Sequence, residues 1–139
     1  MAEAPPCVRD LMQTALHTLK RNDPLTTAED LMKQARIRHL PVLDADDRLC
    51  GIVSQRDLFR GMLLRSLGFG TRAEDRLLAD HVVKEAMIKD VVTVSPETPL
   101  ADAAKLMLDR KIGCLPVVAG NDLVGILTEA DFVAHYAGG

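Results

Sequence analysis

Apolar positions recur at helical spacing in two stretches of the chain, residues 25–35 and 100–108. In the first stretch they are Leu25, Ala28, Leu31, Met32 and Ala35, and in the second Leu100, Ala103, Ala104, Met107 and Leu108. This spacing gives each stretch one apolar face and predicts two amphipathic helices. Asp23-Pro24 and Thr98-Pro99 stand directly before them. We expect Asp23 and Thr98 to cap the helices and each proline to take the first helical position.

Short apolar runs rich in β-branched residues flank both helices and predict strands. They cover residues 15–19, 40–43 and 49–53 and, in the second half of the chain, 91–94, 114–118 and 123–127. Short helices are expected at 8–12 and 82–88, and a further helix begins near Gln55 and another near Glu129. The order is therefore β-α-β-β-α, twice, which is a mixed α/β (α+β) fold.

The second half of the chain repeats the first. The run Gly51-Ile52-Val53-Ser54-Gln55-Arg56-Asp57 returns as Gly125-Ile126-Leu127-Thr128-Glu129-Ala130-Asp131. Likewise, Ile37-Arg38-His39-Leu40-Pro41-Val42 returns as Ile112-Gly113-Cys114-Leu115-Pro116-Val117. We divide the chain into a first repeat with an N-terminal helix (1–60), a partly helical linker (61–82) and a second repeat (83–139). Each repeat is marginal in size for a core of its own, so the two are expected to stack.

The predicted linker carries an apolar cluster formed by Met62, Leu63, Leu64 and Leu67. Two interpretations stay open for this cluster. It covers the surface of its own domain, or it forms an interaction face for a second subunit, because an exposed apolar patch usually signals association.

Composition narrows the classes of function. The 139 residues are 47% apolar with a net charge of −3, which is typical of a soluble globular domain. With three Phe, one Tyr and no Trp, the chain lacks the aromatic platforms that stack single-stranded nucleic acid. No apolar run reaches the length of a membrane span, and the N-terminus does not resemble a signal peptide. We therefore expect a cytoplasmic protein, with nucleic acid an improbable partner.

Catalytic and metal-binding motifs are not apparent. Cys7, Cys50 and Cys114 are odd in number and lack metal-ligand or redox spacing, so reduced thiols in a cytoplasm are the simplest interpretation. The four histidines form no constellation of metal ligands. There is no phosphate-binding lysine loop and no paired-carboxylate motif. We expect neither an enzyme nor a required cofactor.

Both repeats contain Leu-Pro-Val followed by Gly-hydrophobic-x-Ser/Thr-x-x-Asp, and in this the chain closely resembles tandem CBS domains, the family named after cystathionine β-synthase. The resemblance covers nearly the whole chain. It implies two β-α-β-β-α units packed through their sheets as a pseudo-two-fold pair, often called a Bateman module. It also implies clefts between the units that hold adenine nucleotides or related adenosyl ligands. Such modules commonly dimerise, and they usually sense rather than catalyse.

The resemblance assigns roles to residues in both copies. Asp57 and Asp131 would accept hydrogen bonds from ribose hydroxyls, and Ser54 and Thr128 would donate to phosphate, assisted by free amides at the next helix. Gly51 and Gly125 would allow close backbone approach. The remaining nucleotide-binding candidates are the strand-entry threonines, the base-slot residues and their neighbours: Thr18, Ile37, Arg38, His39, Leu40, Pro41 and Arg56, and Thr93, Ile112, Cys114, Leu115 and Pro116.

Each assignment has a plainer alternative. The motif aspartates, serine and threonine could cap helices, although duplication beside a hydroxyl favours a ligand role. Thr18 and Thr93 could be ordinary strand residues, the isoleucines are core residues first, and Cys114 is best interpreted as a half-buried structural thiol.

The two copies also differ in charge. Arg36, Arg38, His39 and Arg56 of the first are replaced by Lys111, Gly113, Cys114 and Ala130 in the second. Glu129, beside Thr128, would oppose a phosphate. We predict unequal sites, with the pocket that carries Arg56 favoured for charged nucleotides. Alternatively, these arginines are solvated or pair with Asp44, Asp46 and Asp47.

These observations predict a stand-alone, energy-sensing regulatory module, a homodimer, that signals to an unknown protein effector. AMP, ADP or ATP is the expected ligand, with S-adenosylmethionine or NAD also possible. A structural dimerisation adaptor with vestigial ligand clefts is the alternative. Nucleic-acid binding through the arginine cluster that includes Arg60 is the weakest interpretation, because the chain is acidic overall.

Overall fold

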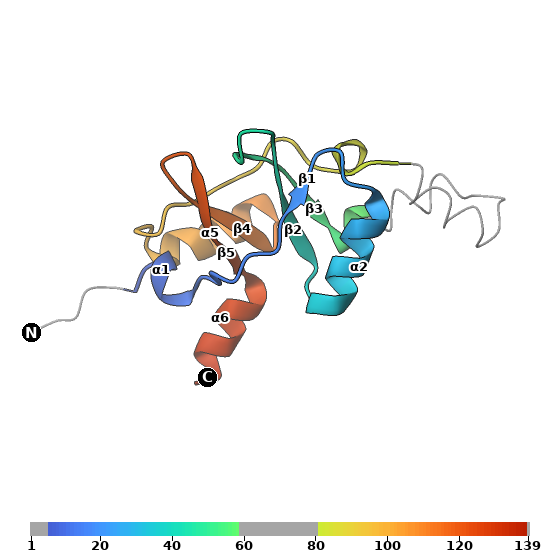
Figure 1. The fold of residues 1–139 in the computed structure, drawn as a ribbon. Coiled ribbons are helices and arrows are strands. Elements are labelled where there is room, and N and C mark those ends of the chain that lie inside the picture. The colour runs from blue at the N-terminus through green and yellow to red at the C-terminus, as the bar shows by residue number, and fades with distance from the viewer. Residues whose placement is uncertain (1–5, 59–80, 139) are drawn as a thin grey trace, which may run out of the picture. The chain divides into compact units, whose positions relative to one another are not determined.

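The computed structural model describes residues 6–58 and 81–138 (Figure 1). It divides into two compact units. The central unit is His17–Val91, and the terminal unit combines Met1–Leu16 with Val92–Gly139. The predicted linker, with Met62, Leu63, Leu64 and Leu67, lies outside the described residues except for positions 81 and 82.

The central unit contains a three-stranded sheet in the order β1-β2-β3. Its elements are β1 (Leu19–Lys20), α2 (Leu25–Ala35), β2 (His39–Leu43), β3 (Leu49–Ser54), a helical segment at 55–58 and the short 3-10 helix η1 (Val83–Glu85). β1 runs parallel to β2, and β2 runs antiparallel to β3 with His39 opposite Ser54. This is the predicted β-α-β-β-α order.

The terminal unit repeats this order around the antiparallel hairpin β4-β5. Its elements are α1 (Val8–Leu11), α5 (Leu100–Arg110), β4 (Cys114–Ala119), β5 (Asp122–Thr128) and α6 (Glu129–Tyr136). Val94 forms a single parallel bridge to Val117, in the place that β1 holds in the central unit. The predicted mixed α/β fold class is thus confirmed, although the strands expected at 15–19 and 91–94 are reduced to two residues and one bridge.

The predicted helix caps are wrong in detail. Pro24 and Pro99 are extended, with ψ of 148° and 140°, so that they precede the helices rather than begin them. Asp23 Oδ2 accepts from the Lys20 amide at 2.8 Å, and Thr98 Oγ1 accepts from the Ser95 amide at 3.1 Å. These side chains therefore close the turns before the helices instead of capping them, because an extended proline puts the first helical amides one residue further on.

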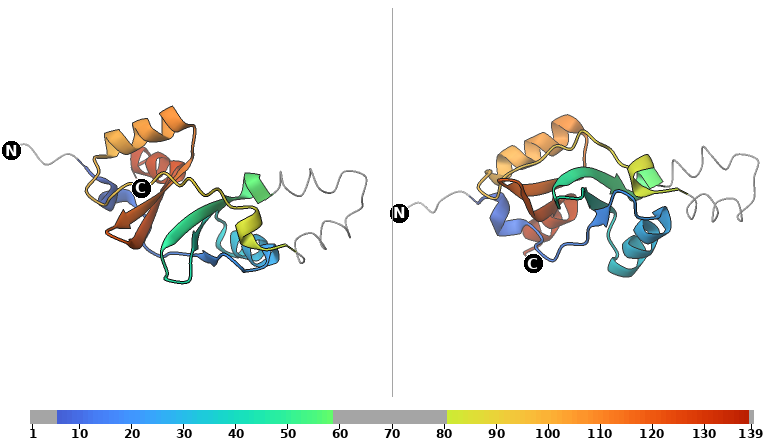
Figure 2. Two further views of the ribbon diagram at one scale, coloured as in Figure 1. Left: turned by 90° about the horizontal axis from the view of Figure 1, so that it is seen from above. Right: turned by 45° about the horizontal axis from the view of Figure 1, so that its top comes forward.

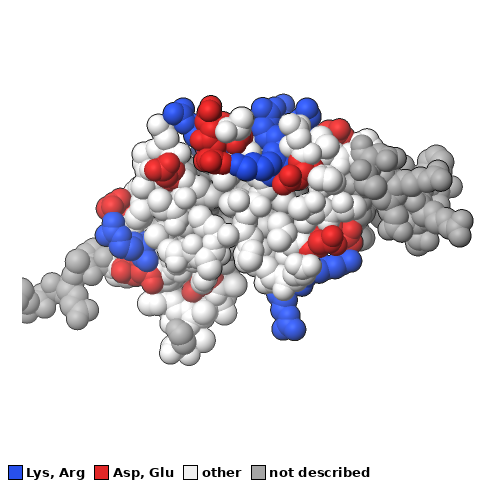
Figure 3. Space-filling model, in the orientation of Figure 1, with Lys and Arg blue, Asp and Glu red and all other residues white. Residues whose placement is uncertain are grey.

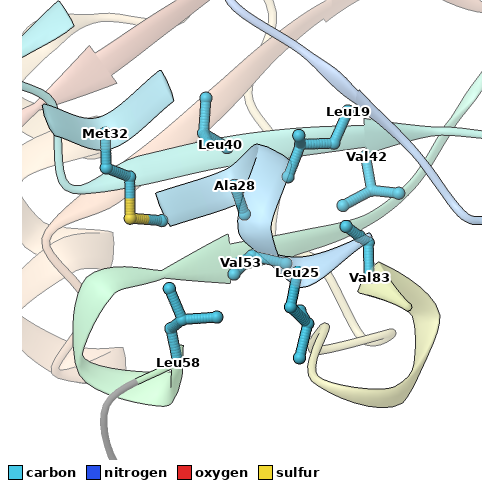
Figure 4. Packing of buried hydrophobic residues seen from close by; sticks show 9 residues of the cluster. All are labelled: Leu19, Leu25, Ala28, Met32, Leu40, Val42, Val53, Leu58 and Val83. Atoms are coloured by element: carbon cyan, nitrogen blue, oxygen red, sulfur yellow. The ribbon is translucent and has the colours of Figure 1, made fainter. Parts of the chain in front are cut away.

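The opening helical turn of each repeat packs in the core formed by the other repeat. Val83, in the second repeat, is fully buried in the core cluster of the central unit, near Leu25 and Val42 (Figure 4). Figure 2 shows η1 beside the start of α2 and next to the helical segment 55–58. Val8, in the first repeat, is fully buried in the core of the terminal unit. The compact units therefore differ from the sequence repeats by an exchange of these turns, and the repeat boundaries themselves stay a prediction.

Backbone hydrogen bonds fix both exchanged turns. The Leu25 amide donates to the His81 carbonyl at 3.0 Å, and the Val83 amide donates to the Asp23 carbonyl at 2.8 Å. In the terminal unit the Val8 amide donates to Thr98 at 2.8 Å. The first free amide of α2 is thus satisfied by the segment that precedes η1 rather than by a local side chain.

Candidate functional site

Each unit places one Ser/Thr-x-x-Asp motif at the corner where a strand ends and a helix begins. Ser54 is the last residue of β3 and is followed by the helical segment 55–58, and Thr128 is the last residue of β5, directly before α6. The central unit also holds the other candidates from Thr18 to Arg56, and the terminal unit holds those from Thr93 to Pro116. Every unit therefore gathers one complete copy of the predicted site residues.

In the central unit the serine and the aspartate of the motif are hydrogen-bonded to each other. Ser54 Oγ donates to Asp57 Oδ2 at 2.7 Å, and the Asp57 amide donates to Ser54 Oγ at 3.0 Å. The single hydroxyl proton of Ser54 is consequently used within the motif. The capping role that the sequence left open is present, and a phosphate would have to draw this proton away from Asp57.

The terminal unit has the same arrangement in a capping box that opens α6. Asp131 Oδ2 accepts from the Thr128 amide at 2.8 Å and from Thr128 Oγ1 at 3.2 Å. Its other carboxylate oxygen, Oδ1, accepts from Gln13 Nε2 at 2.8 Å. Both oxygens of Asp131 therefore have partners inside the unit.

No such bond to a second oxygen of Asp57 is found within residues 6–58 and 81–138. Ile88 stands where the terminal unit has Gln13, since the 75-residue spacing that relates Val8 to Val83 also relates these two. The sequence interpretation missed Gln13. The repeat alignment matches Gln13 to the apolar Ile88, but His17 and Val92 differ in the same way, so the alignment alone does not single out Gln13.

The glycines of the two motifs are needed for packing against methionine. A Cβ on Gly51 would lie 2.5 Å from Met87 Sδ, and one on Gly125 would lie 2.7 Å from Met12 Sδ. The close approach expected at these glycines thus exists, and in each unit it is made by the methionine that follows the exchanged helical turn.

The predicted base-slot residues differ in accessibility. Leu40 and Leu115 are fully buried core residues, and Pro41 and Pro116 are also fully buried. Ile37 and Ile112 are partly buried against the two cores. In these units the isoleucines leave some apolar surface accessible, whereas the leucines are part of the buried cores. The base-binding slots themselves stay a prediction.

Of the two strand-entry threonines, Thr18 is half-buried and Thr93 is exposed. His39 is half-buried at the start of β2, opposite Ser54. Cys114 takes the equivalent place in β4 and is buried, more completely than expected. Burial raises the pKa of the Cys114 thiol to about 12, and the charge of Asp131 adds to the effect. A thiol held in its neutral form is a poor nucleophile, in line with a structural role.

The charges around the motifs differ between the units. Arg38 and Arg56 are exposed, and the Arg38 carbonyl accepts from the Gln55 amide at 2.7 Å. In the terminal unit Gly113 replaces Arg38, and a Cβ there would lie 3.3 Å from the carboxylate of Glu129. An acidic side chain thus lies over the position that carries a guanidinium in the other unit.

The acidic turn after β2 is satisfied without the motif arginines. Asp44 accepts from the amides of Asp46 and Arg48, and these backbone hydrogen bonds, that of Arg48 first, lower the pKa of its carboxyl group. Asp47 pairs with Lys20. Among the described residues no ion pair joins the motif arginines to these aspartates. Figure 3 shows basic and acidic side chains intermingled on this face, without one continuous basic patch.

Membrane-spanning helices and metal-ligand clusters are both absent from the described residues. No helix in the described part of the chain is long and apolar enough to cross a membrane. Within the same residues no group of three or more histidine, cysteine or acidic side chains could hold a metal ion.

Comparison with known proteins gives consistent relatives. A CBS domain protein of Dictyostelium discoideum is 34% identical, over 91% of this chain and 88% of its own length. A crystal structure from Vibrio cholerae, assigned to acetoin utilization (AcuB), is 40% identical with a TM-score of 0.79, covering 97% of this chain and 93% of that one. The structure of CBSX2, solved in complex with AMP, is 31% identical with a TM-score of 0.77, covering 95% and 96%.

Other relatives are much longer than this chain. It spans 41% of the length of the MJ1225 protein of Methanocaldococcus jannaschii and 23% of a homoserine O-acetyltransferase from Methanohalobium evestigatum. The similarity to the latter therefore covers only a part of that enzyme. The family model for the CBS domain matches this chain twice, at residues 8–64 and 83–138. With the motif corner present in each unit and a CBS domain match over both repeats, the chain belongs to the CBS domain family.

Proposed function

We propose that this protein is a regulatory module that binds adenine nucleotides or related adenosyl ligands at its Ser/Thr-x-x-Asp corners. AMP, ADP and ATP are the favoured ligands, and S-adenosylmethionine and NAD are the remaining ones to test. The single observation that carries the proposal is the duplicated corner. In each copy a hydroxyl at the end of a strand and a carboxylate lie together with the first backbone amides of the following helix. The relative solved with AMP, 31% identical to this chain, supports an adenosyl ligand.

The central corner has the chemistry that a nucleotide needs. The second oxygen of Asp57 suits a ribose hydroxyl, because an ionised carboxylate accepts hydrogen bonds and charge strengthens them. Arg56, exposed and next to Asp57, offers a guanidinium to a phosphate. Ile37 adds apolar surface for a base. In the terminal corner Ala130 takes the place of Arg56, and the neighbouring Glu129 adds a negative charge, so we propose the Asp57 corner as the tighter site for phosphorylated ligands.

The regulatory part of the proposal is a conformational response read by a partner protein. A ligand can shift an equilibrium between two conformations only by the difference of its affinities for them. We propose a cytoplasmic homodimer as the responding species, with an effector that is not covalently part of these repeats. No catalytic step is proposed.

A thermal-shift panel with AMP, ADP, ATP, S-adenosylmethionine, NAD and GTP tests the binding proposal. A ligand that binds only the folded state stabilises it by mass action, by roughly 2.7 kcal/mol when the ligand concentration is a hundred times Kd. The melting temperature rises as a consequence. The rise should be lost in Asp57→Ala and kept in Asp109→Ala, a matched aspartate on the exposed face of α5. A flat panel with a well-folded protein would contradict the proposal.

A structural dimerisation adaptor is the second candidate, favoured by the exposed face of α6. Val133 and Tyr136 are 68% and 89% exposed, although they are large and apolar or aromatic. An adaptor would self-associate through such a face without any ligand dependence. Val133→Asp should then give monomers in sedimentation velocity, while Leu108→Asp on α5, 78% exposed, should not. An unchanged sedimentation coefficient for Val133→Asp would count against this face.

A further inference from the structure

Asp57 and Asp131 occupy equivalent corners, yet their carboxylate oxygens differ in their hydrogen-bond partners. Asp131 has Thr128 on one oxygen and Gln13 Nε2, at 2.8 Å, on the other. Asp57 has Ser54 on one oxygen, and no hydrogen bond to its other oxygen is found in the described parts of the chain. A ligand diol would find a free acceptor at Asp57 and an occupied one at Asp131.

The position of Gln13 is set by its backbone. Its amide donates to the Ile126 carbonyl at 2.8 Å, and its carbonyl accepts from the Ile126 amide at 3.0 Å. The preceding Met12 packs onto Gly125, where an added Cβ would lie 2.7 Å from Met12 Sδ and 3.1 Å from the Gln13 carbonyl oxygen. These contacts hold Gln13 beside Ile126 of β5, three residues before the start of α6, and bring the side-chain amide of Gln13 to Asp131.

The central unit repeats this frame with a different side chain. The Ile88 amide donates to Ile52 at 2.9 Å and its carbonyl accepts from Ile52 at 3.0 Å, while Met87 packs onto Gly51. Ile88 thus holds the position beside its corner that Gln13 holds in the terminal unit. It is 47% exposed, so it leaves apolar surface there instead of a hydrogen-bond donor.

We propose that Gln13 is the specificity-determining residue that makes the two adenosyl sites unequal. Its side-chain amide competes with the ribose hydroxyls for Asp131, so the diol binds first at Asp57 and reaches Asp131 only by displacing the amide. This inference rests on the proposed function and adds a residue whose role is independent of the charges of Arg56 and Glu129. Hydrogen bonds to charged groups are strong enough for the competition to matter.

Isothermal titration of the full chain with AMP tests the inference through reciprocal exchanges. The wild type should show one tight site, lost in Asp57→Ala, and one weak site, lost in Asp131→Ala. Gln13→Ile should tighten the weak site roughly tenfold, and Ile88→Gln should weaken the tight site by a similar factor. Gln13→Ala removes the amide without adding apolar surface, so it separates release of Asp131 from a new contact to the base.

A ligand without the diol separates competition from a structural effect. With 2′,3′-dideoxyadenosine 5′-monophosphate, Gln13→Ile and Gln13→Ala should leave the weak site unchanged. A variant that merely disturbs the corner would alter both ligands alike. In NMR spectra the side-chain amide signal of Gln13, identified by its loss in Gln13→Ala, should move only as the second site fills.

The outcomes distinguish this inference from the function on which it rests. Silence towards AMP, ATP and S-adenosylmethionine in every variant would remove the proposed function and the inference with it. AMP binding that is the same in wild type, Gln13→Ile and Ile88→Gln would overturn the inference alone. Weaker binding at Asp131 in Gln13→Ala would also overturn it, because Gln13 would then position the carboxylate rather than compete for it.

Discussion

Ser54 and Asp57 combine two tasks in one pair of side chains. Their reciprocal bonds of 2.7 and 3.0 Å satisfy an amide at the start of a helix, as a capping pair does. A nucleotide would need the Ser54 hydroxyl for its phosphate, whereas its ribose would use the other carboxylate oxygen of Asp57. The Ser54 hydroxyl is already engaged in the resting corner, so a phosphate has to offer a hydrogen bond at least as good as the one it replaces.

Removing the Ser54 hydroxyl should destabilise the protein. Ser54→Ala leaves the Asp57 amide without its acceptor, and the loss of such a cap costs about 1 kcal/mol. Ser54→Thr keeps the hydroxyl and is the matched control. Urea unfolding monitored by circular dichroism measures the difference. Equal midpoints for Ser54→Ala and the wild type would show that the pair contributes nothing to stability.

The three cysteines should separate into two reactivity classes. Cys7 and Cys50 are half-buried, with burial raising the pKa of Cys50, whereas Cys114 is buried and its pKa is raised to about 12. Since the thiolate is the reactive form, Cys114 should resist a thiol reagent such as DTNB at pH 8 until the protein unfolds. Two fast equivalents and one released by denaturant are expected, and Cys114→Ala should abolish only the slow one. Rapid labelling of all three would contradict the buried neutral thiol.

At the scale of elements, the apolar periodicity located α2 and α5 closely, because a face of Leu, Ala and Met at helical spacing is hard to bury otherwise. The sequence prediction was wrong about where these helices begin. The extended conformation of Pro24 and Pro99 puts the first helical residue after each proline. It also overestimated the first strand of each repeat. A β-rich run becomes a strand only where a neighbouring backbone pairs with it, and Val94 finds only Val117.

The candidate site shows the same division. The motif corners were located from the sequence because duplication marks them, but Gln13 was not, since its bond to Asp131 joins residues 118 positions apart. The partial burial of Ile37 and the full burial of Leu40 likewise depend on how strand and helix pack. Local pattern predicts the corner, and tertiary structure decides which of its lone pairs are free.

Both long helices end on a strained residue. Arg36 and Lys111 take left-handed conformations, with φ of 55° and 56°, where glycine is favoured. Lys111→Gly should therefore stabilise the terminal unit by about 1 kcal/mol. Lys111→Ala removes the same side chain without relieving the backbone and is the control. Thermal unfolding distinguishes them, and a lower melting temperature for the glycine variant than for the alanine variant would refute the argument.

At the scale of the whole molecule, the exchange of the opening turns ties each sequence repeat to the core of the other. Val8 and Val83 match each other in the repeat, yet Val8 is fully buried in the terminal unit and Val83 in the central unit. A segment of one repeat without the other would lack part of its own core. The duplication is thus built into the folding of the chain as well as into its candidate sites.

Substituting the two valines tests the exchange directly. Val83→Ala should cost about 2 kcal/mol through lost burial and a small cavity, and the cost should fall on the central unit. Native-state hydrogen exchange read by mass spectrometry should show faster exchange in β2 and β3, with β4 and β5 less affected; Val8→Ala should reverse the pattern. The two variants are controls for each other, since the same methyl groups are removed from matched positions. If Val83→Ala instead accelerated exchange mainly in β4 and β5, each turn would belong to its own repeat.

The same variants also bear on ligand binding: Val83 precedes Met87 and Ile88 on the segment that frames the Asp57 corner. Loosening it should weaken that corner more than the one that holds Asp131.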